Sequence, residues 1–224
     1  MIYLMGGRGS SSGGGGTPSS DIWGQGGGSP SSGTDMNLAG LTPMQGNKVD
    51  GAATLASVEA STQGLDHEQL FVVDSQGFVV AATDGDKGSV PITARTARNL
   101  KGNVMTHNHP RDNAEVNGGT FSYADINCLS LGMKELRASA REGTYSLKAK
   151  TNRADGAGFA AYMLKNKNTI NKGMAQASSK LNAKNYKSES SFAAAKFNAE
   201  MEWLSGWYSQ NAGKFGYKYT FTKS

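Results

Sequence analysis

Glycine is concentrated at one end of the chain, and its placement limits how much of the sequence can fold. Residues 1–50 contain 14 of the 30 glycines and eight serines, but only five charged side chains. A segment of this composition buries too little apolar surface to offset the entropy it loses on ordering. We therefore expect a flexible Gly/Ser-rich leader over residues 1–49, with structure beginning near Asp50. The rest of the chain, about 170 residues, is long enough for a sizeable core.

The sequence gives no sign of an oxidising compartment or of a membrane. A single cysteine excludes a disulfide framework. No apolar run approaches the roughly 18 residues that a membrane helix needs. The apolar start, residues 1–5, is followed at once by glycines and is too short for a signal peptide. We expect a soluble intracellular protein with no membrane partner.

Basic residues gather in the C-terminal third. Residues 147–224 carry 13 Lys or Arg and four Asp or Glu, whereas the remainder carries 10 basic and 14 acidic residues. A basic region of this kind is compatible with nucleic acid or an acidic partner. All but one of the 13 are lysines, without the arginine clusters that grip phosphate groups. We therefore favour a solvated helical surface and keep nucleic-acid binding as an alternative.

The period of the hydrophobic pattern changes once along the chain. Up to residue 150, short apolar runs rich in β-branched residues alternate with turn residues, which predicts an α+β core over residues 50–150. After Asp155, apolar residues recur at helical spacing, which predicts a helical extension over residues 151–224 that closes on an alternating strand. The expected strands are 69–73, 78–82, 103–107, 135–139, 144–148 and 217–222, and the expected short helices of the core are 55–59, 92–100 and 123–131.

Two of the three histidines, His107 and His109, are two residues apart at the end of an expected strand. Alternate residues of a strand point to the same side, so both imidazoles can reach one ion. Asp125 follows in the first turn of the next expected helix and can supply an oxygen ligand. Two histidine nitrogens and one carboxylate suit Zn²⁺ and leave the fourth tetrahedral position to water.

Each of these motifs also has an explanation without a metal. A histidine pair at a strand end is often simply hydrogen-bonded. Ser122 and Asp125 have the spacing of a helix capping box. The two roles are compatible, because Asp125 can cap with one carboxylate oxygen and ligate with the other. We expect the imidazole nitrogens and an Asp125 oxygen to converge on one point.

The order of the motifs resembles a known family. His107-Asn-His109-Pro followed by Ser122-x-x-Asp125 is similar to the metal site of the JAB/MPN (JAMM) metalloproteases, and most of all to their RadC-like branch. The resemblance covers roughly residues 66–150. It implies a JAB/MPN-like (cytidine-deaminase-like) fold, in which a mixed sheet is flanked by helices. The expected fold is therefore this α+β domain with a C-terminal helical extension.

The resemblance also implies a function, that of a Zn²⁺-dependent peptidase or isopeptidase acting on a peptide or an isopeptide-linked protein. The metal ligands would be His107, His109 and Asp125. A family glutamate precedes the histidine strand, and Glu68 at the head of the strand at 69–73 has the matching place as general base. Two other acids upstream of the histidines, Glu59 and Asp66, are alternatives for the general base.

Ser122 would donate a hydrogen bond to the oxyanion that develops during hydrolysis. The segment between the second histidine and this serine, residues 110–121, is longer here than is usual in the family. A longer loop over the site is expected to alter substrate access or to abolish activity.

The start of the leader, Met5-Gly-Gly-Arg-Gly-Ser10, resembles that of many phage and prophage proteins. This implies a protein of the bacterial host cytoplasm or one associated with a virion. Two alternatives to the enzyme stay open. One is a non-enzymatic virion or head-associated protein, whose domain serves for attachment and whose leader contacts an assembly partner. The other is a nucleic-acid-binding protein that uses the lysine-rich region.

Overall fold

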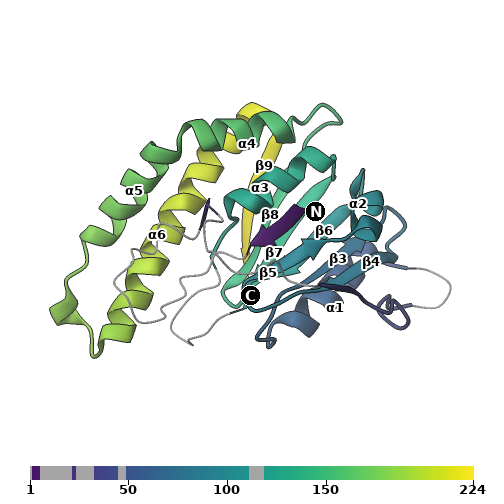
Figure 1. The fold of residues 1–224 in the computed structure, drawn as a ribbon, viewed down its shortest axis with the longest axis horizontal. Helices are drawn as coiled ribbons and strands as arrows, with labels where there is room; N and C mark the ends of the chain where they lie inside the picture. The colour runs from purple at the N-terminus through teal and green to yellow at the C-terminus, as the bar shows by residue number, and fades with distance from the viewer. Residues whose placement is uncertain (1, 6–21, 24–32, 45–48, 111–118) are drawn as a thin grey trace.

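The computed structural model describes residues 2–5, 22–23, 33–44, 49–110 and 119–224 (Figure 1). Its centre is a seven-stranded open sheet with the strand order β2-β4-β3-β6-β7-β8-β9. The strands are β2 Thr34–Asp35, β3 Gln69–Val73, β4 Val79–Asp84, β6 Val104–Asn108, β7 Glu135–Ala140, β8 Gly143–Ala149 and β9 Tyr217–Lys223. Neighbouring strands are antiparallel except β6 and β7, which are parallel. The expectation of an α+β fold with a mixed sheet is confirmed.

Helices flank both faces of this sheet. They are α1 Gly51–Thr62, α2 Ala94–Leu100, α3 Tyr123–Cys128, α4 Gly156–Lys165, α5 Lys167–Ser179 and α6 Glu189–Asn211. Short 3-10 turns lie at Leu129–Leu131, Ala183–Asn185 and Ala212–Phe215. Helix α1 packs against one face, and α5 and α6 form a helical hairpin that extends to the side of the sheet (Figure 1). Within the part of the chain that the structure describes, no helix combines the length and apolarity needed to cross a membrane.

Strand β6 lies in the middle of the sheet and separates two buried layers. Its residue His107 pairs with Leu70 of β3, which belongs to the main hydrophobic cluster. The next residue back, Thr106, pairs with Phe71, which belongs to a smaller cluster with Val58 of α1. Because side chains alternate along a strand, His107 faces the main cluster and Thr106 faces α1. The two faces of β6 therefore carry different chemistry.

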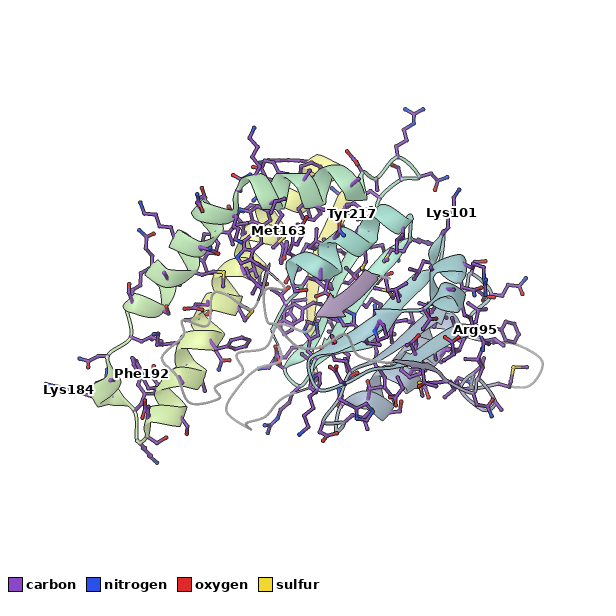
Figure 2. The ribbon with its side chains drawn as sticks, in the orientation of Figure 1. Arg95, Lys101, Met163, Lys184, Phe192 and Tyr217 are labelled. Carbon is purple, nitrogen blue, oxygen red and sulfur yellow. The ribbon has the colours of Figure 1, made fainter. Side chains whose placement is uncertain are left out.

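The C-terminal extension completes both the sheet and the main cluster. Strand β9 pairs with β8 along its whole length. The apolar residues that repeat at helical spacing in α4, α5 and α6 are mostly buried, and the core side chains Phe159, Met163 and Tyr217 belong to the same cluster as Leu70. Figure 2 shows Met163 and Tyr217 in this interior, whereas Lys184 lies at the far end of the α5–α6 hairpin. The helical stripes are packing faces, as expected.

Structure begins earlier than Asp50, contrary to expectation. Strand β1 Ile2–Met5 pairs with β5 Ser89–Ile92 in a separate two-stranded sheet, and β2 pairs with β4. Ile22 and Trp23 are buried in the main cluster, where the Trp23 indole donates to the Asn171 side chain at 2.6 Å. The rest of the expected flexible leader, 6–21, 24–32 and 45–48, lies outside the described residues.

The expected helix at 92–100 was placed slightly too early. It begins at Ala94, where the Thr93 side chain accepts a hydrogen bond from the Thr96 backbone, and the residues before it form β5. The partner of β5 is β1, which is more than 80 residues earlier in the sequence, so the local pattern does not reveal this pairing. The other expected strands and core helices are confirmed, with boundaries that differ by a few residues.

Candidate metal centre

The structure brings His107, His109 and Asp125 together, and we call these three residues the metal centre. The two Nε2 atoms are 3.0 Å apart. His107 Nε2 lies 3.3 Å from Asp125 Oδ1, and His109 Nε2 lies 3.9 Å from Asp125 Oδ2. Ligand atoms about 2.0–2.1 Å from a tetrahedral zinc ion stand about 3.4 Å from one another. The observed separations bracket that value, so the expected convergence is confirmed and the donor set fits a metal ion.

The orientation of His109 follows from two hydrogen bonds at the end of β6. Its backbone N–H donates to Ser139 of β7 at 2.8 Å, which continues the sheet pairing past Asn108. Its Nδ1 lies 3.0 Å from the Gly119 carbonyl oxygen, an acceptor that requires the proton on Nδ1. The other nitrogen, Nε2, therefore presents its lone pair to the metal centre, as a metal-ligating imidazole does.

Asp125 has the capping role expected of it and keeps one carboxylate oxygen outside the cap. The capping box at the start of α3 is present: the Ser122 hydroxyl accepts from the Asp125 backbone N–H at 3.2 Å. In return, the Ser122 backbone N–H and hydroxyl both donate to Asp125 Oδ2, at 2.7 and 2.8 Å. The cap therefore uses Oδ2 and leaves Oδ1 directed towards His107.

The three side chains of the metal centre are buried, so any of their polar atoms without a hydrogen bond is costly. His107, His109 and Asp125 are 1%, 4% and 0% exposed. Among the described residues, neither Asp125 Oδ1 nor His107 Nδ1 has a hydrogen-bond partner. Leaving a buried polar group unsatisfied costs about 1–3 kcal/mol, and more for a charged one. A cation at the point of convergence would satisfy Oδ1, since buried charges are normally paired or coordinate metals.

The protonation states also suit metal binding. Burial and the neighbouring His107 lower the pKa of His109 and favour the neutral imidazole. Burial acts to raise the pKa of Asp125, but the two imidazoles and the Ser122 hydrogen bonds outweigh it and hold this pKa below its usual value. A neutral imidazole and an ionised carboxylate are the ligand forms of these side chains.

Glu68 lies on the histidine face of the sheet. Leu70 pairs with His107 at the end of the β3–β6 register. The side chains of Glu68 and Leu70 share a face because they are two residues apart. Glu68 is fully buried, and its backbone bonds to Asp86 and Gly85 at 2.8 and 2.9 Å.

The other two upstream acids have different positions. Glu59 is on the opposite face of β6, where its carboxylate accepts from Thr106 at 2.9 Å and from two nitrogens of Arg137 at 2.6 and 3.0 Å. Asp66 is exposed and contacts the His67 imidazole at 3.1 Å. Of the three candidate bases, Glu68 is therefore the one that lies on the face of the metal centre.

Asn108, the middle residue of the histidine motif, has contacts that the sequence pattern does not reveal. Its Oδ1 accepts from the Gln69 backbone N–H at 2.6 Å, and its Nδ2 donates to the His67 carbonyl at 2.9 Å. These bonds hold the backbone on both sides of Glu68. The sequence carries one signal, since an amide at the end of a buried strand must find partners, but it does not identify those partners.

Comparison of the chain with protein-family models, with curated proteins and with solved structures found no match in any of the three. Support for a function therefore comes from the chemistry of the metal centre and its surroundings.

Proposed function

We propose that this protein is a zinc-dependent peptidase or isopeptidase of JAB/MPN type, with His107, His109 and Asp125 as the zinc ligands. One observation carries the proposal: three ligand atoms from two separate elements converge in a buried site, and Asp125 keeps Oδ1 directed there while Oδ2 caps α3. Three protein ligands with an open fourth position are typical of catalytic rather than structural zinc sites. The choice of zinc follows from two imidazoles and one carboxylate.

The chain's own residues supply the rest of the chemistry. When bound, the zinc ion polarises the scissile carbonyl and lowers the pKa of a water molecule towards neutrality. Glu68 takes a proton from the attacking water and returns it to the leaving amine. Its place two residues before Leu70, the partner of His107, and its burial support this role. The Asn108 bonds to residues 67 and 69 fix the backbone from which it acts.

Ser122 has a more demanding role. Its hydroxyl donates to Asp125 Oδ2, so donation to an oxyanion requires this hydrogen bond to exchange. The Ser122 backbone N–H still donates to the same oxygen at 2.7 Å. Asp125 therefore keeps one of its donors when the hydroxyl turns to the substrate, and the helix cap is weakened without being lost.

The decisive test combines zinc content with turnover. We expect the purified wild-type protein to bind zinc and to cleave members of a panel of fluorogenic peptides and lysine-isopeptide substrates. Glu68→Gln keeps the size of the side chain and removes the base, so turnover should fall about 10²–10⁴-fold with zinc content and melting temperature unchanged. Glu59→Gln, on the other face of β6, is the control for loss of a buried carboxylate and should keep its turnover.

Three outcomes contradict the proposal. A wild-type protein that binds no zinc removes the metal centre altogether. A Glu68→Gln protein that cleaves at the wild-type rate removes the proposed base, and a wild-type protein that binds zinc but cleaves nothing supports the non-enzymatic attachment module.

A further inference from the structure

A short stretch of chain, residues 119–122, joins the two halves of the metal centre, and we call it the connecting segment. At one end, the Gly119 carbonyl accepts from His109 Nδ1 at 3.0 Å. At the other end, Ser122 binds Asp125 Oδ2 through its hydroxyl and its backbone N–H. Any shift of this segment therefore changes the orientation of one imidazole and one carboxylate together.

The C-terminal extension holds the connecting segment at Gly119. This glycine has a φ of +80°, in the left-handed region that favours glycine. A Cβ atom there would lie 3.0 Å from both Cγ and Sδ of Met201 and 3.3 Å from Cζ of Phe197. Helix α6 thus packs directly on the backbone that orients His109. On the other side, the Gly119 N–H donates to Glu142 of the β7–β8 turn at 3.1 Å.

Two tyrosine hydroxyls of the extension bind the next two residues of the segment. Tyr219 of β9 lies 2.8 Å from the Thr120 hydroxyl and 2.7 Å from the Ser205 hydroxyl of α6. Tyr208 of α6 is fully buried and donates to the Phe121 carbonyl at 2.8 Å. Phe121 immediately precedes Ser122, so this bond fixes the backbone from which Asp125 is held.

From these contacts we infer that Tyr208 and Tyr219 are positioning residues for the metal centre, acting through the connecting segment on Asp125 and His109. This inference rests on the proposed zinc site. Groups that orient the ligands of a metal typically change its affinity by 10–100-fold when they are removed. The extension is then part of the site, although it lies outside the region that resembles the JAB/MPN family. Tyr219 is 99 residues from its partner Thr120 in the sequence.

A purely structural role for the two tyrosines makes a different prediction. Their rings belong to the aromatic core, where Tyr208 packs edge-on against Phe121 and Phe159. If packing were their whole contribution, removing the hydroxyl would lower the melting temperature and leave the metal-binding properties of the folded protein unchanged. Zinc affinity and metal geometry therefore separate the two roles.

The experiment uses Tyr208→Phe, Tyr219→Phe and the double variant in the full chain. The matched control is Tyr162→Phe, because Tyr162 belongs to the same extension and its hydroxyl bonds to Asn211 at 3.3 Å instead of to the connecting segment. Zinc affinity is measured by competition with a chromophoric chelator, and metal geometry by the visible absorption spectrum of the Co²⁺-substituted protein. The melting temperature of each metal-free protein is recorded alongside.

We expect zinc affinity to fall about tenfold in each single variant and further in the double variant, with an altered cobalt spectrum. Tyr162→Phe should keep the wild-type affinity and spectrum. If Tyr208→Phe fails to fold, Ser205→Ala removes a hydrogen bond from Tyr219 while keeping both tyrosines, and a smaller loss of zinc affinity is expected. Wild-type affinity and spectrum in the tyrosine variants would overturn this inference alone, whereas a wild-type protein that binds no zinc would overturn the proposed function and this inference with it.

Discussion

The two faces of β6 each bury a carboxylate beside cationic or basic side chains, but the two carboxylates differ in how fully their oxygens are hydrogen-bonded. On the α1 face, Glu59, Arg137, Thr106 and Thr144 form what we call the ion-pair cluster. Both oxygens of Glu59 accept from donors there, at distances from 2.6 to 3.3 Å. On the other face, Asp125 Oδ1 has no hydrogen-bond partner among the described residues, and the Nε2 atoms of the two imidazoles lie 3.0 Å from each other.

This difference identifies a binding site better than burial or charge does. The ion-pair cluster is balanced in charge, because Arg137 also binds Glu135 at 3.0 Å and Lys148 lies 3.7 Å from the same carboxylate, so that two cations face two carboxylates. The metal centre is incomplete, because its ligand atoms point at one another. Such an arrangement costs stability, and a bound cation would offset that cost.

The largest expected effect concerns the incomplete cluster. Zinc at a concentration 1,000 times its dissociation constant should raise the free energy of unfolding of the wild-type protein by about 4 kcal/mol. His109→Ala removes one of the three ligands, so this stabilisation should disappear. The measurement is chemical denaturation with zinc and with a chelator. Equal stabilisation of wild type and His109→Ala by zinc would mean that the metal binds elsewhere.

A substitution in the ion-pair cluster should lower stability without changing zinc binding. Arg137→Met leaves the Glu59 carboxylate buried without its cation, which should cost about 3 kcal/mol because breaking a buried pair is strongly destabilising. Zinc affinity should not change. The control is Arg98→Met, since Arg98 is exposed on α2 and a surface substitution is usually within about 0.5 kcal/mol. A loss of zinc binding in Arg137→Met would show that the two clusters are coupled.

The sequence predicted the parts of this comparison that depend on local pattern. Strand alternation put His107 and His109 on one side, and the capping spacing put Asp125 at the start of α3 with one oxygen to spare. The ion-pair cluster was not predicted, because Glu59 and Arg137 are 78 residues apart and neither belongs to a short motif. Glu68 could be separated from Glu59 and Asp66 only by the register between β3 and β6.

The missed strands have a similar explanation. Residues 2–5 and 89–92 are each too short and too far apart to predict as partners, and the buried pair Ile22 and Trp23 stands in a segment whose composition favours disorder. The sequence pattern predicts a helix around Tyr208 and a strand around Tyr219, but it does not reveal the partners of their hydroxyls. Their contacts with residues 120 and 121 depend on tertiary structure alone.

Gly119→Ala should have an intermediate effect and sharpen the comparison. A non-glycine residue in the left-handed region costs about 1–2 kcal/mol, and the new Cβ would also crowd Met201. Because the Gly119 carbonyl holds His109, zinc affinity should fall as well. Gly102→Ala is the matched control: its φ is +77°, with no atom within 4 Å of the new Cβ, so it should lose stability and keep zinc affinity. Equal zinc affinity in both variants would argue against any role of Gly119 in orienting His109.

The smallest effect concerns another buried carboxylate, Glu200 of α6, which belongs to neither cluster. Burial raises its pKa, and the hydrogen bond from Ser178 and the charge of Lys196 only partly oppose this. From about pH 4.5 up to that raised pKa, the folded state therefore binds more protons at this site than the unfolded state, so this group's contribution to stability decreases as the pH rises. Glu200→Gln should be close to wild type in stability at pH 4 and more stable than wild type at pH 7.

Glu202→Gln, at an exposed position of the same helix, is the control and should change stability little at either pH. If Glu200→Gln instead loses stability at pH 7, the ionised carboxylate has a stabilising partner there, and burial of an incompletely bonded carboxylate would no longer be a sufficient sign of cost in this protein.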